Sequence, residues 1–159
     1  MEKITDAILL KGSMRAALYN VYTGEKLKEV ENKNVIVTAG RAWVLKHIAG
    51  TAVFNGNETA PLSYLAIGTS TTAPATSDTG LGSETTRKAI QNFTTSNLTS
   101  NPPSYQIECS FATNEGNTTL AEVGLLNSSS GGTMLAHATF GTINKTTSNT
   151  LGISYTISG

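Results

Sequence analysis

The most regular hydrophobic pattern in the chain lies at its C-terminal end. Asn149, Leu151, Ile153, Tyr155 and Ile157 alternate strictly with five Thr, Gly and Ser residues. Successive side chains of a β-strand point to opposite faces, so this pattern gives one apolar face and one face of short polar groups. Residues 147–158 are therefore predicted to form a strand with one buried face.

Weaker alternation, bounded by turn-rich stretches, predicts further strands along the chain. Together with the C-terminal strand they number about eight, and they cover residues 11–22, 25–31, 62–68, 85–94, 105–112, 121–126 and 134–140. The strand at 25–31 carries several Lys and Glu residues, which is typical of an exposed edge strand. A short apolar run, Val35-Ile-Val37, follows it.

One segment has the pattern of a helix. Thr38 is a candidate N-cap, Trp43 belongs to a group of apolar residues with helical spacing, and Gly50 supplies a stop. We expect Trp43 to anchor the helix on the core and His47 to lie on its polar side. The helix is predicted to cross one end of the sheets.

These elements predict a mainly β fold, a two-sheet antiparallel β-sandwich with one short helix and non-sequential strand pairing of jelly-roll or Greek-key type. A length of 159 residues fits one domain, 1–159. Residues 1–10 are expected to form an N-terminal arm.

Charge narrows the range of partners. Charged residues make up 14% of the chain, and eleven basic residues balance eleven acidic ones. A net charge of zero removes the basic surface expected of a nucleic-acid-binding protein, and a weakly charged surface favours packing against neighbours. No signal peptide or membrane-spanning run is recognisable, so we expect a protein made in the cytoplasm that leaves the cell by lysis and needs no membrane partner.

The residues that carry chemistry are few and scattered. Two His, one Cys and eleven carboxylates form none of the usual metal, nucleophile or phosphate-binding motifs. Cys109 has the setting of a buried thiol, and His137 that of an ordinary strand residue beside Leu135 and Thr139. Glu115 with Glu122 is the one local carboxylate pair that a glycoside hydrolase would need. We therefore expect a protein that is not an enzyme and uses no cofactor or metal.

One loop is expected to contact a neighbouring subunit, and one ion pair is expected to stabilise the fold. The long non-periodic segment 69–80 is predicted to contact a neighbouring subunit, because a loop of this length in a compact domain usually has a function. The candidate contact residues in and beside it are Thr69, Thr72, Pro74, Asp78 and Leu81. A second extended loop is expected at 95–104. We also expect a structural salt bridge between Arg87 and Glu122.

The order of several short motifs resembles small virion structural proteins of tailed bacteriophages, which include capsid decoration or cement proteins and tail-fibre or baseplate attachment modules. The motifs are Gly68-Thr69 and Ala73-Pro74 followed by Asp78-Thr79 and Leu81, then Glu84 and Arg87, then Ala121-Glu-Val-Gly-Leu125, then Gly132-Thr-Met-Leu-Ala136 up to Phe140, and a Thr-rich last strand. The resemblance runs from about Val35 to the end of the sequence.

The resemblance implies a β-sandwich that forms dimers or trimers and docks on a virion, with the major capsid protein as the expected partner. A capsid decoration or cement protein is the first interpretation, because no heptad or collagen-like repeat follows the last strand. A tail, baseplate or short tail-fibre component is the alternative, and a carbohydrate-binding or hydrolytic virion module is the third.

Overall fold

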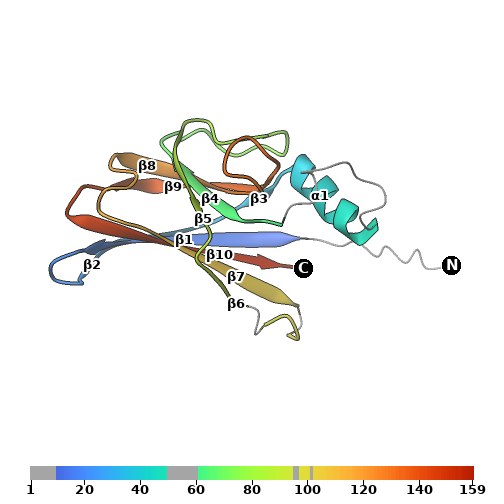
Figure 1. Ribbon diagram of the computed structural model, residues 1–159, viewed down its shortest axis with the longest axis horizontal. Coiled ribbons are helices and arrows are strands. Elements are labelled where there is room, and N and C mark those ends of the chain that lie inside the picture. Colours follow the sequence, from blue (N-terminus) through green and yellow to red (C-terminus); the bar gives the residue numbers. More distant parts are fainter. Residues whose placement is uncertain (1–9, 50–60, 95–96, 101) are drawn as a thin grey trace.

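The computed structural model describes residues 10–49, 61–94, 97–100 and 102–159. Within them the chain forms two five-stranded antiparallel sheets that pack as a β-sandwich, with one helix at one end (Figure 1). The mainly β fold predicted from sequence is therefore confirmed. The expected N-terminal arm lies outside the described residues except for Leu10, which packs against the core.

The first sheet, sheet A, brings the two ends of the described chain together in its centre. Its strands in spatial order are β2 (Lys26–Lys33), β1 (Lys11–Asn20), β10 (Asn149–Ser158), β7 (Ser104–Phe111) and β6 (Asn92–Thr94). β1 and β10 pair over their full lengths, from Lys11 opposite Ser158 to Asn20 opposite Asn149. The charged strand β2 lies at the edge, as its Lys and Glu residues predicted.

The second sheet, sheet B, has the order β3 (Val35–Ile36), β9 (Met134–Asn144), β8 (Thr119–Leu126), β4 (Tyr64–Gly68) and β5 (Glu84–Ala89). The helix α1 (Thr38–Ala49) packs against β9. Gly50, the expected helix stop, lies outside the described residues. Trp43 packs against the core, as predicted, and its ring lies 3.9 Å from the His47 ring between centroids.

The core fills the space between the sheets. The alternation predicted for the last strand is present in β10, where Leu151, Ile153, Tyr155 and Ile157 are buried and the residues between them are half-exposed. Cys109 is part of this core, and burial raises the pKa of its thiol to about 11. It behaves as the small buried hydrophobe that its sequence setting predicted.

The predicted strand at 85–94 is in fact two strands in different sheets. β5 ends at Ala89 in sheet B, and β6 begins at Asn92 in sheet A. Between them the N–H of Ile90 donates to the Ser63 carbonyl at 2.8 Å, and that of Gln91 to the Glu108 carbonyl at 3.2 Å. The chain crosses from one sheet to the other without Gly or Pro, so no turn residue marked the break.

The two outer faces of the sandwich differ. The outer face of sheet B is covered by α1 and by the segment between β4 and β5, seen in green at the top of Figure 1. The outer face of sheet A carries exposed and half-exposed side chains, including Arg15, Glu31, Glu108 and Ser154. The inner strands β4, β8 and β9 of sheet B are thus largely buried on both faces, whereas sheet A is buried on one.

Candidate assembly site

The segment of residues 69–83, here called the cover loop, lies across the outer face of sheet B. Its first end is fixed by the Thr69 N–H, which donates to the Ser83 carbonyl at 3.0 Å. Its middle reaches α1, where the Thr38 N–H donates to the Thr76 carbonyl at 2.7 Å. Leu81 packs over Gly124 of β8, where an added Cβ would lie only 3.0 Å from the Leu81 Cδ2. These contacts give the cover loop a fixed path.

Glu122 of β8 is the main anchor of the cover loop. Its side chain is completely buried on the outer face of sheet B. Oε1 accepts hydrogen bonds from the N–H groups of Ser70 at 3.1 Å and Ser83 at 2.7 Å, and Oε2 accepts one from Gly82 at 2.9 Å. A buried carboxylate requires such donors to offset its lost hydration.

His137 of β9 links Glu122 to a second carboxylate. Its Nε2 lies 3.1 Å from Glu122 Oε2 and its Nδ1 lies 2.8 Å from Asp78 Oδ2, while the residue is only 4% exposed. Each ring nitrogen of His137 thus lies within hydrogen-bonding distance of a carboxylate oxygen from a different segment. The chain Asp78–His137–Glu122 therefore joins the cover loop to two strands of sheet B.

Asp78 makes the cover loop sensitive to acid. Burial would raise the pKa of its carboxyl, but hydrogen bonds from the Ala75 N–H and from His137 outweigh that effect and place the pKa below its ordinary value of 3.8. A carboxyl whose pKa is lowered by folding stabilises the fold above its ordinary pKa, and this contribution is lost as the pH falls through the lowered value.

The five predicted contact residues divide between the surface and the interior. Thr72 is exposed, and Thr69 and Pro74 are half-buried. Asp78 and Leu81 instead point into the protein, toward His137 and Gly124. The last two residues hold the cover loop in place, so of the predicted set only Thr72 is fully available to a partner.

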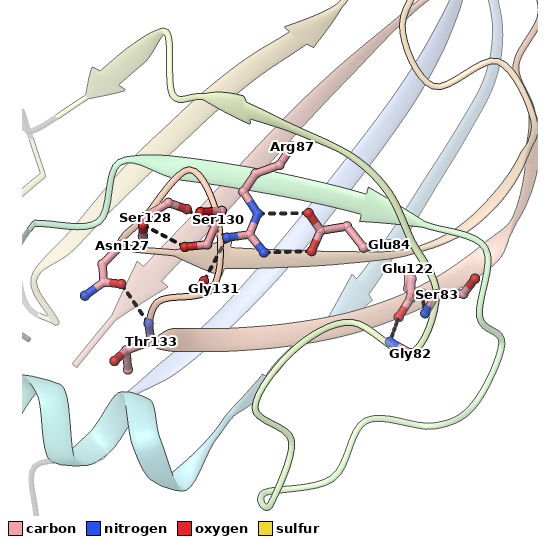
Figure 2. A network of polar contacts seen from close by, with 10 residues as sticks. All are labelled: Gly82, Ser83, Glu84, Arg87, Glu122, Asn127, Ser128, Ser130, Gly131 and Thr133. Atoms are coloured by element: carbon pink, nitrogen blue, oxygen red, sulfur yellow. Dashed lines mark hydrogen bonds and ion pairs between the residues drawn. The ribbon is translucent and has the colours of Figure 1, made fainter. Parts of the chain in front are cut away.

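The salt bridge expected between Arg87 and Glu122 does not form. Arg87 pairs with Glu84 instead. Arg87 makes a two-pronged pair with Glu84, Nε to Oε1 at 2.9 Å and Nη2 to Oε2 at 2.7 Å (Figure 2). Its Nη1 donates to the carbonyls of Ser128 and Gly131, which fixes the turn between β8 and β9. Figure 2 shows Glu122 apart from this pair, directed at Gly82 and Ser83.

Glu115 and Glu122, the carboxylate pair considered for glycoside hydrolysis, have different surroundings in the structure. Glu115 accepts from Lys88 Nζ and from the Ala112 N–H, both at 2.7 Å, and the Lys88 hydrogen bond lowers the pKa of its carboxyl. Glu122 is sealed beneath the cover loop. Each carboxylate is thus held by its own set of donors.

Metal-binding clusters and membrane-spanning helices are both missing from the described part of the chain. Residues 10–49, 61–94, 97–100 and 102–159 contain no group of three or more His, Cys, Asp or Glu side chains that could hold a metal ion. Among the same residues, no helix has the length and apolar character needed to cross a bilayer.

Tyr22, the most exposed large apolar side chain among the described residues, lies in a place that sequence reasoning did not single out. Residues 20–27, here called the hairpin tip, comprise the turn between β1 and β2 and the adjoining strand ends, and they carry Tyr22 at 83%, Leu27 at 47% and Val21 at 44% exposure. The hairpin tip projects from the end of the sandwich away from α1 (Figure 1). The signal available in the sequence was Val21-Tyr22, two large apolar residues next to the turn residues Thr23-Gly24.

The hairpin tip is held in one conformation by its own polar groups. Asn20 Oδ1 accepts from the N–H of Tyr22 at 2.8 Å and of Thr23 at 3.2 Å, and Gly24 adopts a φ of 71° that favours glycine. The Val21 N–H donates to the carbonyl of Ser148 at 3.0 Å, which ties the hairpin tip to the turn before β10. Its apolar side chains are thus presented on a preorganised support.

When the chain is compared with protein-family models, with curated proteins and with solved structures, nothing matches. The resemblance to virion proteins therefore rests on the sequence motifs alone.

Proposed function

We propose that this protein is a non-enzymatic virion structural protein, a capsid decoration or cement protein that docks on the outer shell of a bacteriophage through its hairpin tip. The observation that carries this proposal is the preorganised, projecting turn with three exposed apolar side chains, Val21, Tyr22 and Leu27. Large aromatic and aliphatic side chains on a rigid support are the usual anchors of protein interfaces.

The size of the hairpin tip favours a repetitive partner. A stable complex of two proteins buries roughly 800 Å² on each partner, which is more than a single eight-residue turn offers. A contact this small becomes effective when a particle repeats it many times or when several linked copies bind together. A symmetric shell fulfils this requirement, whereas a single soluble partner does not. Assembly into a dimer or trimer remains a prediction.

The neutral surface and the buried loop anchors agree with this proposal. Equal numbers of acidic and basic residues leave little long-range repulsion between neighbouring copies. The conspicuous carboxylates Glu122 and Asp78 are engaged in holding the cover loop. The proposal therefore assigns the chain a role in packing and stabilising the shell.

The double variant Tyr22→Ser, Leu27→Ser tests the docking surface. We expect binding to shells assembled without this chain, measured by co-sedimentation, to weaken at least roughly tenfold, because two apolar anchors are lost. The melting temperature should change little, since both side chains are exposed. Leu98→Ser is the matched control, an exposed leucine outside the hairpin tip, and should bind like the wild type. Full binding by the double variant would refute docking through the hairpin tip.

A further inference from the structure

The open face of sheet A contains a polar groove, here called the trough. Its main part has a volume of about 370 Å³, within the range of roughly 300–1,000 Å³ usual for small-molecule sites. A smaller hollow of about 250 Å³ adjoins it and shares Arg15 and Ser154 with it. The two together follow the outer side of β10.

The strand register explains why this face is hollow. Ser154 of β10 lies between Arg15 of β1 and Glu108 of β7, and Gly152 lies between Ala17 and Ser110. The middle strand thus carries short side chains, and long polar ones stand on the strands beside it. Arg15 and Glu108 are two strand spacings apart, about 10 Å at the backbone.

The walls of the trough present both hydrogen-bond donors and hydrogen-bond acceptors to solvent. Within the described part of the chain Arg15 makes no hydrogen bond or ion pair, so its guanidinium donors face solvent. Opposite it, the Glu108 carboxylate accepts a single long hydrogen bond among the described residues, from Gln106 at 3.4 Å, and Asn92 stands next to Glu108 on β6. A ligand lying on β10 would reach donors on one side and acceptors on the other.

An aromatic ring completes one end of the trough. The Tyr19 ring leans over Gly152, with its Cε2 3.8 Å from the position that a Cβ would occupy there. Tyr19 is among the exposed large hydrophobic residues, so part of its ring is available to a ligand. An exposed tyrosine beside planar polar side chains offers both a flat apolar surface and hydrogen bonds.

From these features we propose that the trough is a binding site for a neutral oligosaccharide. Sugar hydroxyls donate and accept equally, which matches walls that contain Arg15 on one side and Glu108 with Asn92 on the other. In the main part of the trough the charges of Arg15 and Lys26 are balanced by Glu29 and Glu108, and Glu31 adds a negative charge in the smaller hollow, so an anionic polymer gains no net attraction. A peptide strand would need an open sheet edge, but the trough lies on a sheet face.

The test is a titration of the isotope-labelled full chain, followed by NMR, with cellohexaose, maltohexaose and the hexamer of N-acetylglucosamine at millimolar concentration. The proposal predicts saturable shifts of trough amides with at least one of them. Ser154→Phe, which fills the trough, should abolish the shifts, and Arg15→Ala should weaken binding roughly tenfold. Thr85→Phe, an exposed strand position of sheet B, is the matched control and should bind like the wild type.

Three results would overturn the proposal. They are no saturable shift with any of the three sugars, binding that survives Ser154→Phe in a variant whose spectrum shows a folded protein, and binding of a heparin hexasaccharide in place of the neutral sugars. The inference goes beyond docking through the hairpin tip and does not depend on it, because the two sites share no residue proposed as a contact.

Discussion

Glu122→Gln should lower the free energy of unfolding by about 3–5 kcal/mol, because buried donors that the carboxylate satisfies would lose their acceptor. Each carboxylate oxygen accepts two hydrogen bonds, Oε1 from Ser70 and Ser83 and Oε2 from Gly82 and His137. A glutamine places an NH₂ group where one oxygen stood, so two donors lose their acceptor and face another donor.

For a chain of this length such a loss corresponds to a drop in melting temperature of roughly 10 °C or more, measured by circular dichroism. The cover loop should also become the first site of limited proteolysis, because its anchor is gone. Glu25→Gln is the matched control, an exposed glutamate in the hairpin tip, and should melt like the wild type. If Glu122→Gln melts with the wild type and its loop resists protease, the anchoring role is refuted.

Gly40→Ala should cost about 2 kcal/mol net, although alanine normally stabilises a helix by about 1 kcal/mol over glycine. Gly40 faces β9 so closely that a Cβ would overlap the Leu135 carbonyl oxygen and lie 2.6 Å from its Cα. These are backbone atoms that cannot rotate aside, so α1 must shift away from sheet B.

Thermal melting of the two variants Gly40→Ala and Gly80→Ala separates this packing effect from a general effect of the substitution. A Cβ added at Gly80 would have no atom within 4 Å, and Gly80 has no positive φ, so its alanine variant should be neutral or slightly more stable. Equal melting temperatures for the two variants would contradict the close helix–sheet contact.

Much of the sandwich was predictable because its strands combine local alternation with marked turns. The strict pattern in β10 gave both its location and its buried face, and Lys and Glu residues in β2 marked an edge strand. The division of 85–94 into β5 and β6 was not predictable in this way. The crossing at Ile90 is fixed by hydrogen bonds to Ser63 and Glu108, which are distant in sequence.

The partners of the charged residues were harder to predict because they depend on tertiary placement. Arg87 and Glu122 lie on strands that both pair with β4, which makes their pairing reasonable, but Glu84 is nearer to Arg87 in the same strand. The sequence did contain a signal for Glu122, the buried anchor of the cover loop. Glu122 and His137 each interrupt an otherwise apolar strand segment, and such residues need a polar partner when buried.

The cover loop shows that the length of a loop does not tell which of its residues face outward. Its length indicated a functional segment, and Thr72 is indeed exposed. Asp78 and Leu81 are instead committed to His137 and the outer face of sheet B. The hairpin tip, shorter and less conspicuous in the sequence, presents the larger apolar surface.

The central claim, docking on a repetitive virion shell, is tested most directly by counting copies of this chain in purified particles by gel densitometry against the major shell protein. The proposal predicts hundreds of copies per particle, in a fixed ratio to that protein. A handful to a few dozen copies would place the chain in the tail or baseplate instead, and its absence from purified particles would contradict a structural role in the virion.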